Sequence, residues 1–403
     1  MKNSKSILFV SNGHGEDLIA ANLIKSLLAQ DNNLLISELP VVGKGNTFEK
    51  LPVEILGPRE TLPSGGFARN SWQNLWDDLK GGLINNTYKQ IRVLRRMKNK
   101  VDLSVVVGDV YILTLTGFFT GGDIVFLPTA KSEYINGHFK IEKHIMKRYA
   151  DLVLPRDNKT TNNLKSFGIK TKFFGNLMMD CFEIKGLDFN LRENSTKIGI
   201  LPGSRDDAYD NMLDFINVIE ELERLKKAKY DFLTAVAGNF SVEKLKNKLK
   251  GSEWQAVEQE DDHIKLQIIS PSKASVVSII YNGFGDVLDQ AKLFLGMAGT
   301  ANEQAAGMGK PVVTFPGTGV QFDYEFAADQ KRLLGEGVKF VDRNFKNVAY
   351  ALIELLEDEQ EYNKRSKAGQ KRMGDRGAIK KVSNLIFQDF LFPLYQKLHL
   401  FFD

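Results

Sequence analysis

Short apolar runs alternate with longer amphipathic stretches over most of the chain. Each run is about one strand long and is bounded by glycine or proline, which is typical of parallel strands joined by helical crossovers. In chain order the runs are SILFVSNGHG, LSVVVGD, DIVFLP, DLVLP, KIGILPGSR, YDFLTAVAG, SVVSIIYNGFG, KLFLGMAGT and PVVTFPG. The pattern predicts an α/β protein built from doubly wound parallel sheets.

A polar stretch from Lys185 to Lys197 interrupts this pattern. A chain of 403 residues is long for one hydrophobic core, so two domains of about 180 to 200 residues are the default expectation. We predict a Rossmann-like domain over residues 1–188, a second over 189–378, and a C-terminal helix over 379–403 that crosses back towards the first domain. The loops at the carboxyl ends of the two sheets would face each other across a cleft.

Composition narrows the classes of function. Lys and Arg exceed Asp and Glu by only 54 − 50 = 4, which is too few for a dedicated nucleic-acid binder. The single cysteine, Cys181, excludes an internal disulfide and a cysteine-rich metal site, and we expect it in the core of a cytoplasmic protein. The first apolar run is too short for a signal peptide, and no segment reaches the roughly 18 apolar residues of a membrane span.

Two segments are compatible with peripheral contact with a membrane. Residues 79–101 contain seven Lys or Arg and no acid, and residues 382–402 are rich in Phe, Leu and Ile. A solvated helix face and a buried helix, respectively, are the simpler interpretations.

The stretch from Lys292 to Gly317 predicts a strand, a glycine turn, a short helix and a second strand. Gly299 would form the turn and Thr300 would open the helix, whose free N–H groups suit a phosphate. Glu303 in the first helical turn has two interpretations. It could contact a ligand, or it could form a capping box with Thr300 and have no other role.

The loop after the first strand contains Gly13, His14, Gly15 and Glu16, and its glycines allow a substrate to approach the backbone. A third glycine of a dinucleotide fingerprint would fall at residue 18, which is leucine. The missing glycine disfavours a nicotinamide enzyme. Such an enzyme is not excluded, because Glu38 ends the next strand, where an acid could hold a ribose. His14 is either a proton-transfer group or a surface histidine.

Two further polar groups follow predicted strands. Asp109 follows LSVVVG and could accept a proton from an attacking hydroxyl, or it could cap the next helix. Arg205 follows a strand together with Gly203 and Ser204, a combination that suits a diphosphate. The alternative for Arg205 is an ion pair with the acids at positions 206 and 207.

Several motifs together resemble one family. They are LPGSR, the pair Gly175-Asn176 with Asp180, the GMAGTANEQAAGMGKPVVTFPG block and the late GDRGA. The chain resembles lipid-A-disaccharide synthase, and more closely the related branch that begins with SNGHGED. It is similar, more weakly, to the peptidoglycan glycosyltransferase that adds N-acetylglucosamine to a lipid-linked acceptor. The resemblance implies a GT-B fold, with two Rossmann-like domains facing a cleft, and transfer of a sugar from a UDP-sugar with inversion.

Carried over by position, the resemblance assigns roles to individual residues. It implies that Asp109 is the catalytic base, with His14 as the next candidate, and that the loop with Gly13, Gly15 and Glu16 lies on the acceptor side. Glu303 would bind the ribose, Phe284 and Gly285 the nucleobase, and Gln321 the donor sugar. The implied donor-binding residues are Gly203, Ser204, Arg205, Phe284, Gly285, Gly299, Thr300, Asn302, Glu303, Gln304 and Gln321.

The acceptor side departs from the family. PTAKSEYING at residues 128–137 replaces the aromatic signature of lipid-A-disaccharide synthase, so a fatty-acylated glucosamine acceptor cannot be assumed. Trp72 and Trp76 would suit a lipid tail or core packing equally well. We expect a UDP-sugar donor, an N-acetylglucosamine-type sugar and a lipid-linked acceptor, with no metal and no cofactor.

Two alternatives remain open from the sequence. A UDP-sugar epimerase or hydrolase would use the same scaffold without a lipid acceptor, and a non-catalytic scaffold would bind a nucleotide sugar without turnover. The sequence does not decide the oligomeric state.

Overall fold

The computed structural model describes residues 4–59, 83–319 and 321–393. The chain forms two compact units, one made of Met1–Cys181 and Asp375–Asp403 and the other of Phe182–Gly374. These divisions lie a few residues before the predicted boundaries at 188 and 378. Trp72 and Trp76 lie outside the described residues.

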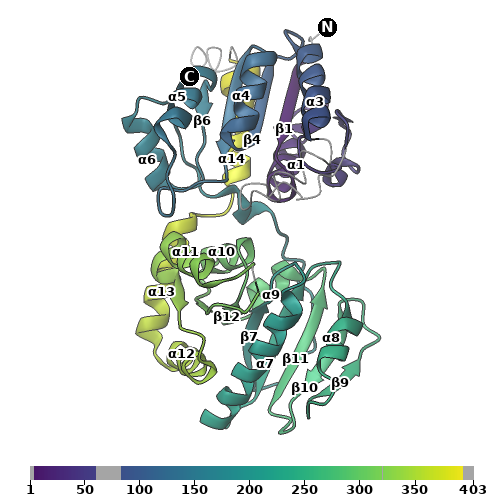
Figure 1. The fold of residues 1–403 in the computed structure, drawn as a ribbon, viewed down its shortest axis with the longest axis vertical. Helices are drawn as coiled ribbons and strands as arrows, with labels where there is room; N and C mark the ends of the chain where they lie inside the picture. Colours follow the sequence, from purple (N-terminus) through teal and green to yellow (C-terminus); the bar gives the residue numbers. More distant parts are fainter. Residues whose placement is uncertain (1–3, 60–82, 320, 394–403) are drawn as a thin grey trace, which may run out of the picture. The chain divides into compact units, whose positions relative to one another are not determined.

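The first unit contains a six-stranded parallel sheet with the order β3-β2-β1-β4-β5-β6, the strand order of a Rossmann fold. Helices cover both faces of this sheet (Figure 1). The strands are β1 Ser6–Ser11, β2 Leu35–Pro40, β3 Glu54–Ile55, β4 Leu103–Gly108, β5 Asp123–Pro128 and β6 Leu152–Val153. The helices are α1 His14–Leu28, α3 Leu83–Met97, α4 Val110–Phe119, α5 Lys140–Tyr149, α6 Asn158–Ser166 and α14 Ala378–Leu385, with short 3-10 helices η1 Asn46–Phe48 and η3 Leu177–Asp180 and a π-helix η5 Ile386–Leu391 after α14.

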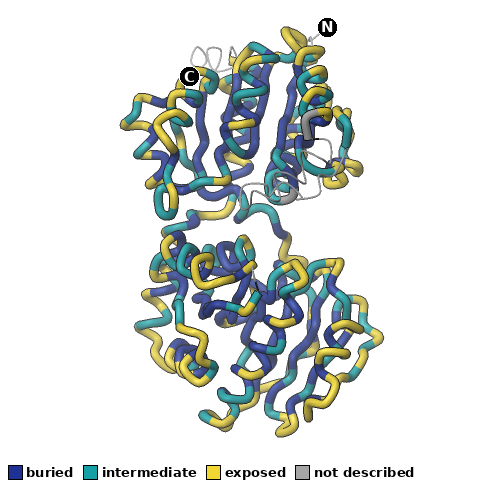
Figure 2. Tube along the Cα trace, in the orientation of Figure 1, coloured by how far each residue is buried: buried dark blue, intermediate teal, exposed yellow. Residues whose placement is uncertain are grey.

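Alternate residues of each central strand pack against different helices. Ile7 and Phe9 of β1 belong to the core formed with α1 and α14, whereas Leu8 and Val10 belong to the core formed with α3, α4 and α5. The central strands are therefore buried on both faces (Figure 2). This explains why the sequence shows continuous apolar runs there rather than alternation.

The described part of the C-terminal segment belongs to the first unit. The carboxylate of Asp180 accepts hydrogen bonds from Gly377 N at 2.6 Å and from Ile379 N at 2.8 Å, which fixes the start of α14. Val382 and Leu391 are buried in the core beside α1. The described apolar side chains of this segment thus fill the unit's own core, as the buried-helix interpretation requires.

The second unit contains an eight-stranded sheet with the order β14-β13-β12-β7-β8-β11-β10-β9. The strands are β7 Thr196–Leu201, β8 Tyr230–Val236, β9 Gln255–Glu258, β10 Ile264–Ile269, β11 Ser275–Tyr281, β12 Leu293–Gly296, β13 Val312–Thr314 and β14 Val338–Phe340. The helices are α7 Ala208–Leu225, α8 Val242–Lys248, α9 Phe284–Gln290, α10 Thr300–Gly307, α11 Tyr324–Leu334, α12 Phe345–Glu357 and α13 Glu359–Met373, with one short turn η4 Gly335–Gly337.

One edge of the second sheet departs from the all-parallel prediction. β10 pairs antiparallel with both β11 and β9. In β10, Ile264, Leu266 and Ile268 are buried while Lys265 is exposed, which is the alternation of a strand with one solvated face. The sequence prediction looked for continuous apolar runs and therefore missed this pair of strands.

Residues 182–187 belong to the second unit because α9 holds them. Asp286 Oδ1 accepts hydrogen bonds from Lys185 N, Gly186 N and Leu187 N at 2.9, 2.7 and 3.0 Å. A buried carboxylate that accepts three backbone N–H groups is a strong local anchor. It explains why the unit begins before the polar stretch that suggested the boundary.

Helix α3 carries most of the basic segment at residues 79–101. Asn86, Gln90 and Leu94 form its buried stripe, and Arg95 and Arg96 are exposed. This arrangement is that of a solvated helix face. Across the described ranges, none of the helices has the length and apolar character needed to cross a membrane.

Candidate functional site

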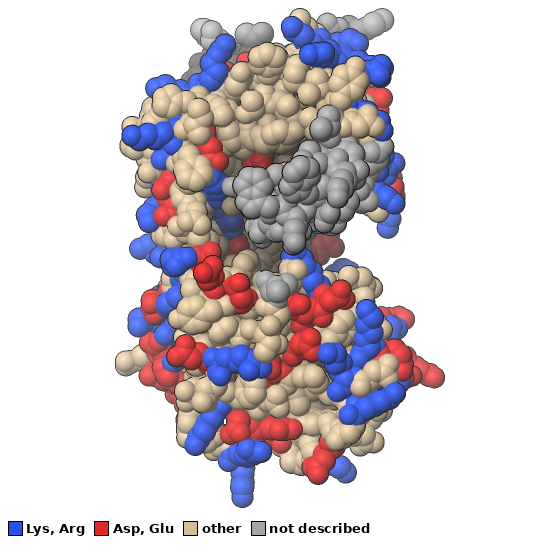
Figure 3. All heavy atoms as spheres, in the orientation of Figure 1, with Lys and Arg blue, Asp and Glu red and all other residues tan. Residues whose placement is uncertain are grey.

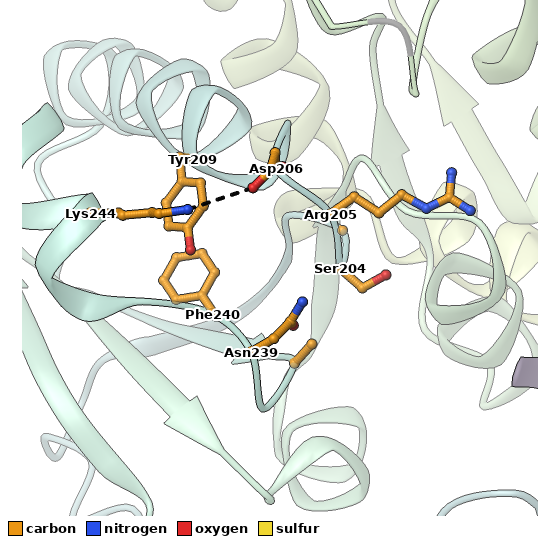
Figure 4. A pocket seen from close by; sticks show the side chains of 9 residues that line it. Ser204, Arg205, Asp206, Tyr209, Asn239, Phe240 and Lys244 are labelled. Atoms are coloured by element: carbon orange, nitrogen blue, oxygen red, sulfur yellow. Dashed lines mark ion pairs between the residues drawn. The ribbon is translucent and has the colours of Figure 1, made fainter. Parts of the chain in front are cut away.

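Three neighbouring strands of the second sheet end at a common edge. β12, β7 and β8 are adjacent and parallel, and Met297 N donates to Leu201 O at 2.9 Å just beyond the paired residues. The loops 202–207, 237–241 and 297–299 therefore meet there, as expected for a ligand site of an open α/β sheet. A cavity of about 170 Å³ at this edge is lined by Gly203, Ser204, Arg205, Asp206, Tyr209, Ala237, Asn239, Phe240 and Lys244 (Figure 4).

The loop after β7 has a conformation that requires glycine. Gly203 has a φ of +96°, and a Cβ at this position would lie 3.2 Å from Met297 O. The absence of a side chain lets the loop lie directly against the end of β12. Ser204 and Arg205 follow it and are exposed.

Arg205 and Gln321, which the sequence proposed separately as donor-binding residues, lie together. Arg205 Nη1 donates to Gln321 Oε1. Gln321 N in turn donates to Asp207 Oδ2 at 2.9 Å, and Asp206 lies 3.8 Å from Lys244 Nζ. The segment around Gln321 thus covers the loop that carries Arg205.

Helix α10 begins at this edge without a side-chain cap. Its N-cap residue is Gly299, no side chain caps it, and Thr300 is already inside the helix. The capping-box interpretation of Thr300 and Glu303 is therefore wrong, because the box requires Thr300 at the N-cap. The first N–H groups of α10 are directed towards the edge of the sheet, where they suit an anion.

Aromatic and acidic groups surround the start of α10. The Phe326 ring from α11 comes within 3.4 Å of the position that a Cβ on Gly299 would occupy, and Phe326 is 39% exposed. Glu303 in the first turn of α10 is 6% exposed. The sequence pointed to Glu303 but gave no signal for Phe326.

Asn302 and Gln304 are both buried in α10. Asn302 Nδ2 donates to Gly296 O at 3.3 Å, and a Cβ on Gly296 would lie 2.1 Å from Asn302 Oδ1. Gly296 thus makes room for the Asn302 amide, which fixes α10 to the end of β12. These contacts favour a packing role for Asn302 over donor binding.

The loop proposed for the nucleobase is covered by its own chain. A Cβ on Gly285 would lie 1.8 Å from Glu183 O, so no ligand can approach that backbone position from this side. The Phe284 ring packs edge to face on Phe182 at 5.9 Å between centroids. Gly285 is therefore required for packing against residues 183–187, which the sequence could not reveal.

Five residues of the cavity were missed from the sequence: Tyr209, Ala237, Asn239, Phe240 and Lys244. The Tyr209 and Phe240 rings stack at 4.7 Å, and Lys244 Nζ lies 5.5 Å from the Tyr209 ring. In Figure 4 these groups form one wall of the cavity, and the Arg205 side chain points away from them. The signal available was the sequence AGNF directly after the strand YDFLTAV, which parallels LPGSR after β7.

The loop after β1 in the first unit is tied to the loop after β5. Gly13 is the N-cap of α1 with a φ of 111° and α1 begins at His14, whose side chain is not described. Gly15 has open space around it. Glu16 Oε1 accepts from Thr129 Oγ1 at 2.8 Å. The role of His14 in proton transfer stays a prediction.

Glu38 is completely buried, so its carboxyl is not presented to a ribose. The Ser11 hydroxyl lies 2.5 Å from Asp17 Oδ1 and 2.8 Å from Glu38 Oε1, and its one proton can serve only one of them. Burial raises the pKa of Glu38 well above its usual range, and the charge of Asp17 raises it further. We infer that Glu38 is protonated and donates to Ser11, which donates to Asp17.

Asp109 caps α4, which is the helix-cap role that the sequence analysis gave as the alternative to proton transfer. Asp109 Oδ1 accepts from Tyr111 N at 2.9 Å and from Ile112 N at 3.2 Å. The side chain also lines a small pocket together with Lys131 and His138. Because one carboxylate oxygen makes both cap bonds, the cap does not prevent the other oxygen from acting on a substrate.

Cys181 is half-buried in the first unit. Burial raises the pKa of its thiol to about 12, so it stays protonated at neutral pH and is a poor nucleophile. Within the described part of the chain, His, Cys, Asp and Glu side chains do not gather in groups of three that could hold a metal ion.

No protein-family model matches the chain, and no curated protein matches it. Solved structures do resemble it over nearly its whole length. S. aureus MnaA, in a structure with UDP, has a TM-score of 0.60 at 18% identity and covers 96% of each chain. MurG from Acinetobacter baumannii has a TM-score of 0.60 at 13% identity, over 96% of this chain and 100% of that one. UDP-GlcNAc 2-epimerase from Neisseria meningitidis, bound to UDP-GlcNAc, has a TM-score of 0.57 at 17% identity, over 96% of this chain and 99% of that one.

The predicted fold class is confirmed. The chain is an α/β protein of the GT-B type with two Rossmann-like units. At these identities the similarity shows the fold alone, and the resemblance to lipid-A-disaccharide synthase stays a prediction.

The inferred proton on Glu38 predicts a pH dependence of stability. Because the pKa of Glu38 is raised in the folded chain, its contribution is complete below the unfolded pKa near 4.5 and is lost as pH rises through the folded pKa. The slope should reach about 1.4 kcal/mol per pH unit while only the unfolded state is ionised. In urea unfolding from pH 4 to 9, the free energy of unfolding of Glu38→Gln should therefore rise relative to that of the unmodified chain as pH rises. The control is Glu54→Gln, which changes an exposed acid of the same sheet. A difference between chain and variant that does not change with pH would contradict the inferred proton.

Proposed function

We propose that this chain is an enzyme that acts on a UDP-sugar and binds its nucleotide diphosphate in the second unit. The observation that carries the proposal is the place of Arg205 at the carboxyl edge of β7, where it lies at the rim of the cavity and bonds to Gln321, together with the uncapped start of α10. The shared fold with MnaA in complex with UDP, and with an epimerase bound to UDP-GlcNAc, supports the same choice of ligand.

The groups at this edge match the charge of a diphosphate. The guanidinium of Arg205 can meet two phosphate oxygens at once, and the exposed hydroxyl of Ser204 can donate to a third. The N-terminus of α10 adds a favourable contribution of about 0.3 to 1 kcal/mol, or about 2 kcal/mol when partly buried. These groups can stabilise the negative charge that develops on a leaving diphosphate.

Glu303 and Phe326 suit the nucleoside. The Glu303 carboxylate lies in the first turn of α10 and can accept hydrogen bonds from ribose hydroxyls. The partly exposed Phe326 ring beside Gly299 offers an apolar face to the ribose or the base. The nucleobase therefore contacts this side of α10 in our proposal, rather than the covered loop at Gly285.

Epimerisation or hydrolysis of the UDP-sugar is the first candidate reaction. Several of the similar structures are UDP-GlcNAc 2-epimerases. Such a reaction needs no second substrate other than water, so it requires of the first unit only groups that can move a proton. Asp109 at the end of β4 is one such group.

Transfer of an N-acetylglucosamine-type sugar to a lipid-linked acceptor is the second candidate reaction. The observation that favours it is a set of exposed apolar side chains on α4 and at the start of α5, two helices that pack together. Tyr111, Phe118, Phe139 and Ile141 are 49%, 68%, 65% and 67% exposed. Uncharged atoms dominate the face of the first unit over α4 (Figure 3). An apolar acceptor tail would cover such side chains. The similarity of the fold to that of MurG is a second support for this candidate reaction.

The proposal predicts that Arg205→Ala weakens binding of UDP. Loss of a charge-assisted contact of about 1.5 to 3 kcal/mol corresponds to a dissociation constant about 10- to 150-fold higher. Isothermal titration with UDP measures it. The matched control is Arg224→Ala, which removes an exposed arginine of α7 in the same unit and should leave UDP affinity unchanged. Equal UDP affinity in the chain and in Arg205→Ala would remove Arg205 from the site.

Asp109→Asn separates catalysis from helix capping. Asparagine keeps a side-chain acceptor for the cap, so stability and UDP affinity should change little. Turnover should fall by about 10² to 10⁴ if Asp109 moves a proton. Nuclear magnetic resonance of UDP-GlcNAc incubated with the protein in D₂O identifies the reaction.

The three outcomes of that incubation are distinct. Exchange of deuterium into the sugar ring with formation of an epimer indicates an epimerase. Release of UDP with free sugar indicates a hydrolase, and release only when a lipid extract is added indicates a transferase. An unchanged UDP-sugar under all conditions, despite binding of UDP, would favour a non-catalytic scaffold. Turnover that survives in Asp109→Asn would exclude Asp109 as the base.

A further inference from the structure

A second, smaller pocket lies at the carboxyl edge of the first sheet. It lies between the end of β4, with Gly108 and Asp109, and the segment after β5, with Ala130 and Lys131. His138, which precedes α5, and Glu142 in α5 complete its lining. The carboxyl edge of an open parallel sheet is the place where such folds bind their ligands.

The imidazole ring of His138 is buried in this pocket without a hydrogen bond. Its side chain is 3% exposed, and neither ring nitrogen has a hydrogen-bond partner among the described residues. The nearest acceptor, Glu142 Oε2, lies 3.5 Å from His138 Nδ1. A buried polar group without a partner is unfavourable, and native structures rarely retain one without a reason.

The neighbours of His138 already satisfy one another. Lys131 Nζ donates to Glu142 Oε1 at 2.7 Å and to Glu142 Oε2 at 2.8 Å, and Phe139 N also donates to Oε2 at 2.8 Å. Glu133 Oε1 accepts from His138 N at 3.3 Å and lies 3.6 Å from Lys143 Nζ. The charges around the imidazole are therefore paired, and the ring remains the group that lacks a partner.

Burial lowers the pKa of His138, although the charges of Glu142 and Glu133 act in the opposite direction and that of Lys131 acts with burial. The ring is therefore neutral near pH 7, with one nitrogen that donates and one that accepts. A hydroxyl group also donates once and accepts, so it matches a neutral imidazole better than an anion or a cation does.

The size of the pocket points to the same ligand. The free space is about 10 Å³, which is room for about one water-sized group. A phosphate or a sugar ring does not fit, but a single hydroxyl does. Asp109 also lines this pocket, and the carboxylate oxygen that it does not use in the cap of α4 can accept a hydrogen bond from such a hydroxyl.

We propose that this pocket, which we call the hydroxyl subsite, binds one hydroxyl group of a saccharide between His138 and Asp109. The inference rests on the proposed function for the identity of the saccharide. His138 binds the hydroxyl directly, whereas Lys131 and Glu142, which bond to each other, line the pocket beside the ring. The hydroxyl belongs either to the sugar of the nucleotide or to a separate saccharide, and the test below distinguishes the two.

The first test follows the ring resonances of His138 in the full chain by nuclear magnetic resonance, with the signal assigned by its loss in His138→Asn. The probes are UDP, UDP-GlcNAc and free N-acetylglucosamine. A shift with UDP-GlcNAc but not with UDP places the hydroxyl on the nucleotide sugar, and a shift with N-acetylglucosamine alone places it on a separate saccharide. Both results support the subsite. A shift with UDP alone, or no shift with either saccharide, overturns it.

The second test measures affinity and stability together. His138→Phe should bind UDP as the unmodified chain does and should bind the saccharide probe about five- to tenfold more weakly, the effect of one hydrogen bond. Its thermal stability should not fall, because the ring makes no hydrogen bond that the variant loses. The control is His144→Gln, which changes an exposed histidine of α5, the helix that follows His138, and should change neither affinity.

The outcomes separate this inference from the proposed function. A loss of stability in both His138→Phe and His138→Asn with unchanged saccharide affinity would show a purely structural histidine and overturn the subsite. Binding of UDP with no saccharide effect at His138 would overturn the subsite and leave the proposed function standing. If the His138 variants bind the saccharide more weakly but the chain does not bind UDP, the subsite stands and the proposed function is overturned.

Discussion

The parallel pairing of β7 with β12 is the constraint on which the proposed nucleotide site depends. The register that joins Leu201 to Gly296 brings the loop after β7 and the turn before α10 to the same level. Gly199 in β7 makes this pairing possible, because a Cβ there would lie 2.0 Å from the Phe294 ring of β12. Gly203 then packs against Met297 O. The proposed diphosphate site at Arg205 and the α10 N-terminus depends on this arrangement of the backbone more than on any single side chain.

The first unit repeats the same principle with different chemistry. The ends of its strands carry titratable groups instead of an arginine and an uncapped helix. Ser11 is the last residue of β1, and Glu38 lies near the end of β2. Asp109 follows β4, and His138 lies in the segment after β5. Their environments differ: burial raises the pKa of Glu38 and lowers the pKa of His138, so in each case it favours the neutral form. Asp109 combines a structural cap bond with access to a pocket.

The sequence predicted most of the fold because buried parallel strands leave a strong signal. Continuous apolar runs that end in glycine identify the central strands, and residues that follow them, such as Arg205 and Asp109, were recognised as site candidates for that reason. The edge strands β9 and β10 alternate polar and apolar residues and escaped notice. The second unit also begins earlier than predicted, because three hydrogen bonds join Asp286 to residues 185–187, which are distant from it in the sequence.

Side-chain packing was less predictable than the fold. Gly285 resembled a ligand-binding glycine, but its space is filled by Glu183 O from a segment about a hundred residues earlier. Tyr209 comes from α7, Asn239 from the loop after β8 and Lys244 from α8, and they meet only in the folded chain. His138 is informative because it lacks partners, which no sequence pattern records.

Amide hydrogen exchange of the full chain with and without millimolar UDP tests the central claim most directly. The account predicts added protection at residues 203–205 and at the first turn of α10, where the backbone N–H groups meet the diphosphate, with no change in β1 and β4 of the first unit. Unchanged exchange at these amides, or protection confined to the first unit, would contradict it.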